Sequence, residues 1–339
     1  MKVFLTGGTG FVGRALVETL TRRGWEVTAL VRKPDSPESR TIQAGGVRLV
    51  LGDVRERESM RRAMKGADAV IHNAAWYKLG IPEGAYGEMR AVNVQGTVNT
   101  IELAAELGIQ KIVYVSTVSV FGDTGDGIAD ETYRRRTPFV SCYDQTKTEA
   151  FEFVRDRQRR GAPVVITCPV AVIGPGDHSI IGSLVRMYVR GLYPPIGFGR
   201  NRNYAFVYID DVAEATARCV ERGRIGETYI LSGGIMSYQD VIHLWGRTPG
   251  GSRRTFLRIP DSWVLRFCQA AEWTERLLGL PIFISRELAL SGMNNEQFTA
   301  RKAERELAME FRSAEQAWQD TLEGERALVQ KIERGNPGG

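Results

Sequence analysis

Residues 6–13 read TGGTGFVG and follow directly on the apolar run Val3-Phe4-Leu5. An apolar run, a glycine-rich segment and then an amphipathic stretch predict a strand, a tight turn and a helix. Glycines let the backbone turn sharply and bring its N–H groups close to a ligand, and the start of the helix presents its positive dipole end to a pyrophosphate. The alternative is a glycine-rich turn that binds nothing. The residues expected to line the turn are Gly7, Gly10, Phe11, Val12 and Gly13.

Length and composition are those of a globular protein. The chain has 339 residues, of which 43% are hydrophobic and 25% charged, and its net charge is +5. These values exclude a disordered chain, and no apolar run reaches the roughly 18 residues that a membrane span needs. Arginines cluster at 134–136 and at 157–160, but no long basic stripe is interleaved with aromatic residues. We therefore expect no nucleic-acid partner.

The cysteines and histidines argue against a disulfide frame and against a metal site. The cysteines, at positions 142, 168, 219 and 268, lie far apart without C-x-x-C spacing, and the chain has three histidines. This usage is typical of reduced thiols in a cytoplasmic protein. The sequence starts with a predicted strand and has no cleavable secretion signal. We expect a cytoplasmic protein without a metal.

Predicted strands and helices alternate through the first two-thirds of the chain. Strands are expected at 3–6, 26–31, 47–51, 69–72, 111–116 and 164–168, and helices at 11–23, 56–65, 87–107 and 144–160. This alternation predicts βαβ units with right-handed crossovers. The fold class is therefore α/β, with a Rossmann-type doubly wound parallel sheet. The remainder predicts a smaller, mainly helical C-terminal substrate domain.

The boundaries follow from where the alternation loosens, near residue 174. Residues 1–174 form the predicted dinucleotide-binding domain, and 205–235 are expected to return to it. Residues 175–204 and 236–330 form the predicted substrate-binding region.

A second constellation lies in the segment SCYDQTKTEA. Tyr143 and Lys147 are four residues apart, so on a helix they share one face and the ammonium lies beside the phenol. A neighbouring cation favours the phenolate and lowers the pKa of a tyrosine from about 10. The hydroxyl pair Ser116-Thr117 ends the fifth predicted strand, at the sheet edge where ligands bind. A hydroxyl that orients a carbonyl oxygen, a phenol that protonates it and a lysine that supports both can reduce a ketone.

Together these segments resemble the extended short-chain dehydrogenase/reductase family, also called the NAD-dependent epimerase/dehydratase family. The resemblance rests on TGGTGFVG, HNAA (72–75), VYVSTVSVFG, YDQTK and FVYIDDVAEA (206–215), and covers roughly residues 1–235. The segment ARKAERELAMEF (300–311) is similar to the end of its reductase branches. Among these branches the chain looks most like dihydroflavonol reductases, 3β-hydroxysteroid dehydrogenases and hopanoid-associated reductases.

The resemblance implies roles for individual residues. It places the pyrophosphate at Gly7, Gly10 and Gly13, the adenine amino group at Asp53 and the Val54 backbone, and the adenosine ribose near Ala74 and Ala75. It makes Thr117 the catalytic hydroxyl, with Ser116 as the alternative, and Tyr143 the group that gives or takes the proton. Lys147 then binds the nicotinamide ribose and lowers the Tyr143 pKa. The segment from Pro169 through Val172 to Ile173 passes the nicotinamide carboxamide. Two residues depart from the family pattern, namely Cys168 in place of an arginine and Tyr208 in place of a histidine.

The end of the second predicted strand bears on the choice of cofactor. Arg32 and Lys33 stand where an acidic residue would accept the ribose hydroxyls of NAD. A guanidinium suits the 2′-phosphate of NADP instead. The sequence favours NADP(H), with NAD(H) as the alternative.

The substrate is expected to be a bulky, mostly apolar small molecule. The family's nucleotide-sugar enzymes commonly carry an asparagine where this chain has Ala171, which argues against a nucleotide-sugar. Large apolar residues fill the predicted substrate region and are expected to pack its core and line a cleft. These apolar residues are Tyr188, Leu192, Tyr193, Pro194, Pro195, Phe198, Trp263, Phe267, Trp273, Leu277, Leu278, Ile282 and Phe283. Contact of these side chains with a membrane surface is the less favoured alternative.

The resemblance also implies that the protein forms a homodimer.

Three functions remain open at this point. The favoured one is an NADP(H)-dependent oxidoreductase that interconverts a secondary alcohol and a ketone. The second is a nucleotide-sugar epimerase or dehydratase with tightly bound NAD. The third is a non-catalytic dinucleotide-binding sensor or assembly protein, although such proteins often lose the tyrosine or lysine that this chain keeps.

Overall fold

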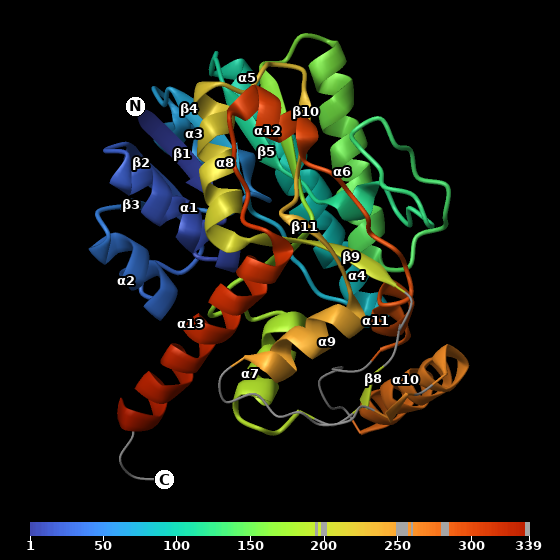
Figure 1. Ribbon diagram of the computed structural model, residues 1–339. Helices are drawn as coiled ribbons and strands as arrows, with labels where there is room; N and C mark the ends of the chain where they lie inside the picture. Colours follow the sequence, from blue (N-terminus) through green and yellow to red (C-terminus); the bar gives the residue numbers. More distant parts are fainter. Residues whose placement is uncertain (194–195, 198–201, 249–256, 259, 279–284, 336–339) are drawn as a thin grey trace.

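A seven-stranded parallel sheet runs through the centre of the protein, in the order β10-β6-β5-β4-β1-β2-β3 (Figure 1). The computed structural model describes residues 1–193, 196–197, 202–248, 257–258, 260–278 and 285–335. The strand order reverses between β1 and β4, and a reversal of this kind opens a crevice at the carboxyl ends of the strands. The strands are β1 (Lys2–Thr6), β2 (Glu26–Val31), β3 (Arg48–Leu51), β4 (Ala69–His72), β5 (Ile112–Val115), β6 (Val164–Pro169) and β10 (Thr228–Leu231).

Helices cover both faces of this sheet. Helices α1 and α8 pack together on one face, and α3, α5 and α6 pack in turn on the other. Strands β4, β5 and β6 are buried along their whole length, as expected of a parallel sheet that is covered on both sides. The helices are α1 (Phe11–Arg22), α2 (Pro37–Ala44), α3 (Arg57–Met64), α4 (Tyr86–Arg90), α5 (Gly96–Glu106), α6 (Cys142–Arg159) and α8 (Ile209–Glu221).

The later part of the chain builds a second core. Phe206, Tyr188, Trp245 and Trp318 pack there with tilted or edge-on rings, the Trp245 ring centroid lying 5.0 Å from that of Tyr188 and 5.3 Å from that of Trp318. A small sheet in the order β11-β9-β7 supports this core. Its elements are β7 (Ala171–Ile173), α7 (Ile180–Val189), β9 (Asn203–Tyr208), β11 (Gly234–Ser237), α9 (Tyr238–Arg247) and α13 (Ala314–Gly335). The other elements are β8 (Ile196–Gly197), β12 (Leu257–Arg258), α10 (Asp261–Leu277), α11 (Arg286–Ser291) and α12 (Arg301–Leu307).

The structure confirms the Rossmann-type sheet and the six strands that the sequence predicted. The helix expected at 87–107 is instead α4, a π-helical turn over Ala91–Gln95, and α5. Helix α2 and strands β7 and β11 were not predicted, because short elements with little periodicity give no local signal in the sequence. The segment 205–235 contributes to two sheets: its strand β10 pairs with β6, while β9 pairs with β7 and β11.

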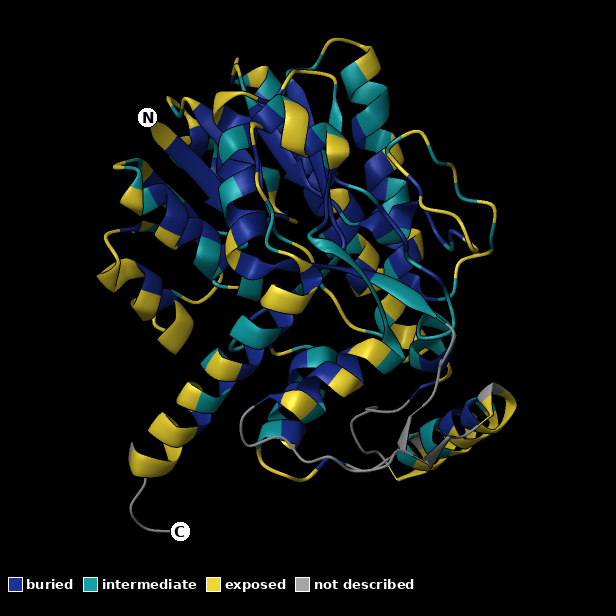
Figure 2. Cartoon of the chain, viewed as in Figure 1, coloured by how far each residue is buried: buried dark blue, intermediate teal, exposed yellow. Residues whose placement is uncertain are grey.

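The apolar side chains singled out in the substrate region have different environments. Tyr188 and Tyr193 are buried in the second core, whereas α10 exposes a row of large apolar side chains, seen as yellow segments in Figure 2. Pro194, Pro195, Phe198, Ile282 and Phe283 lie outside the described residues. Among the described helices, none has the length and apolar character needed to cross a membrane. The exposed side chains of α10 are Trp263, Phe267, Trp273 and Leu277, and Leu278 directly after the helix is exposed as well.

Candidate functional site

The turn between β1 and α1 needs its glycines for space. Gly7 has a φ of +73°, and a Cβ there would lie 2.7 Å from the Ala74 nitrogen. A Cβ on Gly13 would lie 1.9 Å from the Gly7 carbonyl oxygen, so the first turn of α1 packs directly on the loop. Gly10 caps α1 without a side-chain hydrogen bond, which leaves N–H groups at the helix start available to a ligand. A side chain at these positions would fill the space that a pyrophosphate requires, so the glycine turn between β1 and α1, called the cradle below, fits the predicted pyrophosphate.

The other predicted contacts surround this cradle. Phe11 and Val12 open α1 and are half-buried. The Asn73 amide donates to the Gly7 carbonyl over 3.1 Å, and the Ala74 N–H donates to the Thr6 hydroxyl over 3.2 Å. Ala74 is half-buried and Ala75 exposed. The carboxyl ends of β1 and β4 are thereby held together, and they form one wall of the crevice.

A buried histidine continues that wall. His72 shares hydrogen bonds with the Thr6 hydroxyl at 2.8 Å and with the Thr97 hydroxyl at 3.0 Å. Burial lowers the pKa of His72 to about 3, with a smaller contribution from the Lys147 ammonium. The ring is therefore neutral near pH 7 and joins the cradle to the helical layer.

The adenosine end carries charged side chains. Arg32 lies exposed just after β2. The Asp53 carboxylate pairs with Arg55, with a distance of 2.7 Å between Oδ2 and Nη2, and this hydrogen bond is the main cause of a lowered Asp53 pKa. Asn99 donates to the Val54 carbonyl over 2.9 Å and fixes this loop. An adenine amino group at Asp53 would share the carboxylate with Arg55.

Helix α6 carries the predicted Tyr–Lys pair. Its N-cap Ser141 accepts a hydrogen bond from the Asp144 N–H, which starts the helix directly before Tyr143. Lys147 is buried; its Nζ donates to the Val115 carbonyl over 3.1 Å and lies 4.8 Å from the Tyr114 ring centroid. The ammonium is therefore fixed at the carboxyl end of β5.

The pKa of Tyr143 departs from the expectation of the sequence analysis. Burial raises it above the ordinary value, Tyr77, Tyr114 and Asp144 raise it further, and a hydrogen bond with Thr117 acts in the opposite direction. Burial is the largest contribution, and the Tyr77 ring meets the Tyr143 ring edge-on at 4.8 Å between centroids. In this structure the phenol is thus a neutral O–H group.

The two candidate hydroxyls at the end of β5 have different surroundings. Thr117 is half-buried, interacts with Tyr143, and caps the turn Val118–Val120 by accepting from the Ser119 N–H over 3.2 Å. Ser116 is buried, and its hydroxyl makes no hydrogen bond to a described residue. Successive side chains of an extended segment point to opposite sides. The structure therefore brings Thr117, and not Ser116, to the phenol.

The last predicted contact segment begins at the end of β6. Pro169 is buried and pairs with Leu231 of β10, while Val172 is half-buried in β7 and pairs with Val207 of β9. Cys168, which replaces the family's arginine, is fully buried. The chain passes here from the large sheet to the small one.

Asn93 is a site residue that the sequence analysis missed. It lies in the π-helical turn Ala91–Gln95, accepts from the Trp76 N–H over 2.7 Å, and donates to the Trp76 carbonyl and the Thr146 hydroxyl, each over 3.1 Å. It therefore ties the loop that carries Tyr77 to the helix that carries Tyr143. π-Helical turns inside helices are frequent at functional sites, but no sequence pattern marked this one.

Arg135, Asp144 and Glu296 are the other missed residues. The Arg135 guanidinium donates to the Ser119 and Val120 carbonyls, below the turn that Thr117 caps, and lies 4.0 Å from the Asp144 carboxylate. Glu296 reaches this group from far along the chain, because its backbone pairs with Asn203 and Ala205 of β9. Burial, helped by Asp144 and Asp123 and opposed by Arg135, raises the pKa of Glu296 to about 7.

Comparison with known proteins identifies the family. The NAD dependent epimerase/dehydratase family model matches residues 3–232, and the chain belongs to this family. A ketoreductase of 4-hydroxy-2-methyl-3-oxo-4-farnesyl-3,4-dihydroquinoline-1-oxide from Stigmatella aurantiaca is 30% identical over 69% of each chain. A 3-beta-hydroxysteroid dehydrogenase from Mycolicibacterium neoaurum is 27% identical over 95% of this chain and 90% of its own.

Solved structures agree with the fold. The crystal structure of gox2253 has a TM-score of 0.80 and 30% identity, and covers 96% of this chain and 98% of its own. A dTDP-glucose 4,6-dehydratase from Streptomyces venezuelae with NAD bound has a TM-score of 0.78 over 98% of both chains, and at 23% identity it shows the fold alone. With relatives named reductases and dehydrogenases, the chain is an NAD(P)-dependent oxidoreductase of the extended short-chain dehydrogenase/reductase type.

Proposed function

We propose, with membership of this family as the premise, that the protein interconverts a secondary alcohol and a ketone with NADP(H), on a bulky, mostly apolar substrate. The proposal is carried by the contact of Thr117 with Tyr143, together with the Lys147 ammonium, which is fixed at the carboxyl end of β5 from the next turn of the same helix. The cofactor supplies or accepts the hydride at its nicotinamide ring.

The protein's own residues divide the remaining work. The neutral Tyr143 phenol is in the state required to donate a proton to the carbonyl oxygen of a ketone. The Thr117 hydroxyl orients that oxygen, and the Ser119 N–H in turn orients the hydroxyl. Lys147 holds its charge at the end of β5, where it binds the cofactor ribose and stabilises the phenolate left after proton transfer.

The preference for NADP(H) rests on Arg32. Its exposed guanidinium, just after β2, makes no described hydrogen bond or ion pair, and its charge helps to lower the pKa of Asp53. A bidentate guanidinium–phosphate contact then selects the 2′-phosphate. NAD(H) is the alternative cofactor.

The substrate class rests on apolar surroundings and on the relatives. Ile81 and Met89 pack with Tyr143 and Trp76 beside the catalytic phenol. The Stigmatella relative is named for a farnesylated ketone and the Mycolicibacterium relative for a hydroxysteroid, both of which are bulky and apolar. Ala171, in place of an asparagine, gives a nucleotide-sugar no side-chain amide to bind.

The decisive experiment combines one variant with two readouts. Tyr143→Phe keeps the ring and its contact with Tyr77 but removes the proton, so turnover of bulky cyclic ketones should fall by a factor of about 10² to 10⁴. Binding of NADPH, followed by fluorescence titration, should be unchanged. Turnover retained in the variant would overturn the assignment of Tyr143.

Identification of the nucleotide released on denaturation separates the two enzymatic functions. Freely exchanging NADP(H) supports the reductase. Stoichiometric NAD that resists removal would overturn it in favour of a nucleotide-sugar epimerase or dehydratase. The homodimer inferred from the resemblance stays a prediction, for sedimentation analysis to test.

A further inference from the structure

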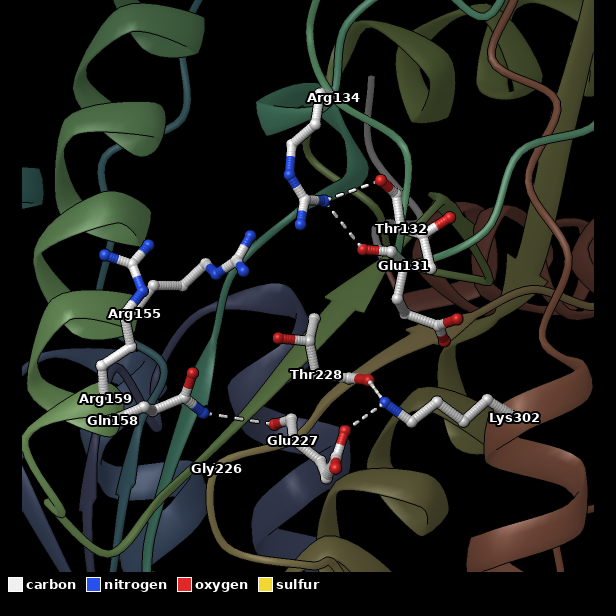
Figure 3. A pocket seen from close by; sticks show the side chains of 10 residues that line it. All are labelled: Glu131, Thr132, Arg134, Arg155, Gln158, Arg159, Gly226, Glu227, Thr228 and Lys302. Atoms are coloured by element: carbon white, nitrogen blue, oxygen red, sulfur yellow. Dashed lines mark hydrogen bonds and ion pairs between the residues drawn. The ribbon is translucent and has the colours of Figure 1, made fainter.

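A pocket of about 300 Å³ lies far from the cofactor crevice, between α6, the start of β10 and α12 (Figure 3). Tyr143 is at the first turn of α6 and Arg155 twelve residues later, which places them about 18 Å apart along the helix axis. The pocket is thus not part of the catalytic site. Its lining residues are Glu131, Thr132, Arg134, Arg155, Gln158, Arg159, Gly226, Glu227, Thr228 and Lys302.

The pocket unites two basic clusters that are separate in the sequence. Arg134 belongs to the cluster at 134–136 and Arg159 to the one at 157–160, and Arg155 lies between them (Figure 3). The proposed reaction uses none of the three arginines that line the pocket. Folding has brought three guanidinium groups around one small volume, where their charges repel each other.

Arg155 is the residue that lacks a partner. Among the described residues it makes no hydrogen bond or ion pair, and its guanidinium only packs over the Phe151 ring at 5.6 Å. The other cations have partners: Arg134 donates to three backbone carbonyls, Lys302 donates to Glu227 over 2.6 Å, and Arg159 lies 4.0 Å from Glu152. Burial and the charges of Arg134 and Arg159 lower the pKa of Arg155, and the Glu152 carboxylate acts in the opposite direction.

The lining residues include four cations, Arg134, Arg155, Arg159 and Lys302, against the two carboxylates of Glu131 and Glu227. Glu227 is neutralised by Lys302 at 2.6 Å. Glu131 accepts from the Ile230 N–H over 2.9 Å, and burial raises its pKa. The side of the pocket that faces Arg155 therefore has an excess of positive charge, and the Thr228 hydroxyl beside it has no hydrogen bond to a described residue.

We propose that this pocket binds a small polyanion that carries phosphate or carboxylate groups. Arg155 supplies the central guanidinium, Arg134 and Arg159 flank it, and the Thr228 hydroxyl donates from the strand. Guanidinium groups bind phosphate and carboxylate oxygens in a bidentate manner, and Arg155 has its donors available for this. The pocket volume admits a compact ligand of this kind and excludes a nucleic-acid strand or an extended peptide.

Isothermal titration calorimetry with inorganic pyrophosphate and with citrate tests the proposal. The full-length protein is first saturated with NADP⁺, so that the glycine cradle is blocked, and the ionic strength is held constant. At least one probe is expected to bind at one saturable site. The probe that binds more tightly shows whether the pocket prefers phosphate or carboxylate groups. Binding of neither probe would overturn the proposal.

Three variants locate the site. Arg155→Gln and Arg134→Gln should each reduce the affinity for the tighter-binding probe by about tenfold or more, because each removes a charged hydrogen-bonding partner. Arg160→Gln is the matched control, because Arg160 is exposed beside Arg159 but does not line the pocket. The Arg160→Gln variant should bind the probe with the affinity of the natural protein. Circular dichroism verifies that each variant is folded. If folded Arg155→Gln and Arg134→Gln bind the probe as tightly as the Arg160→Gln control, the pocket is not the site.

Discussion

Lys147 and Arg155 stand two turns apart on α6, and both are cations partly or fully removed from water, yet only Lys147 has a partner for its charge. Lys147 donates to the Val115 carbonyl and lies over the Tyr114 ring. Arg155 makes no described hydrogen bond or ion pair; the face of Phe151 lies beneath it, and the like charges of Arg134 and Arg159 outweigh the nearby Glu152 carboxylate. A cation with fixed partners serves the permanent chemistry of the crevice, whereas one without them indicates a ligand that supplies the missing charge.

The largest effect is expected at the partnered cation. Lys147→Met should reduce turnover by a factor of about 10² to 10⁴, because the phenolate of Tyr143 loses the charge that stabilises it. Steady-state kinetics with a bulky cyclic ketone provides the measurement. Arg160→Gln, an equally conservative loss of charge near the other end of α6, should keep its turnover. Equal losses of turnover in both variants would contradict a specific role for Lys147 in the reaction.

The cradle gives the next largest effect, now on stability. Gly13→Ala places a Cβ 1.9 Å from a backbone oxygen that cannot move freely, and should lower the free energy of unfolding by about 2 to 4 kcal/mol. The matched control is Gly87→Ala, at a helical position in α4 with nothing within 4 Å of the new Cβ, which should stabilise by about 0.5 to 1 kcal/mol. Urea unfolding measures both, and a tolerant Gly13→Ala would contradict the close packing of α1 on the loop.

Arg32→Ala tests the adenosine end of the crevice. Loss of one guanidinium–phosphate contact should reduce the affinity for NADPH by about tenfold or more and leave the affinity for NADH unchanged. Fluorescence titration with both nucleotides is the measurement. Parallel weakening of NADPH and NADH would remove the basis for NADP(H) preference.

Glu296 provides a dependence on pH. Its pKa rises from 4.5 in the unfolded chain to about 7 in the folded protein, so the folded state holds the proton more tightly. Its contribution to stability is therefore fully present below about pH 4.5 and is lost as the pH rises through about 7. Glu296→Gln cannot ionise and should flatten the fall in stability between these pH values. Asp144, Asp123 and Arg135 face the same group and remain in the variant, so unfolding curves from pH 5 to 8 isolate the contribution of Glu296.

The smallest effect is expected at the unpartnered cation. Without a polyanion, Arg155→Gln should change the free energy of unfolding by less than about 0.5 kcal/mol, because the contact with Phe151 that it loses offsets the repulsion from Arg134 and Arg159 that it relieves. Urea unfolding at low ionic strength is the measurement. A loss as large as that of a core variant would mean that Arg155 has a structural role.

Much of the site could be read from the sequence because its parts obey local rules. The glycine turn depends on the spacing of three residues, and the Tyr143–Lys147 pair depends on helical periodicity. Arg135, Asn93 and Glu296 could not be found in this way. Arg135 is one of three adjacent arginines, and only the folded loop selects it to hold the Ser119 and Val120 carbonyls. Asn93 acts from a π-helical turn, and Glu296 arrives by pairing with β9.

The sequence by itself determined the parallel sheet, the cradle and the catalytic helix, since βαβ units, glycine spacing and periodicity are properties of neighbouring residues. Only the tertiary structure decided that Thr117 rather than Ser116 meets the phenol, that burial raises the Tyr143 pKa, and that the arginine clusters share one pocket. These outcomes depend on which side chains burial removes from water and on which distant segments lie together. Burial and the meeting of distant segments are properties of the packed chain, because contacts between residues far apart in the sequence determine the surroundings of each side chain.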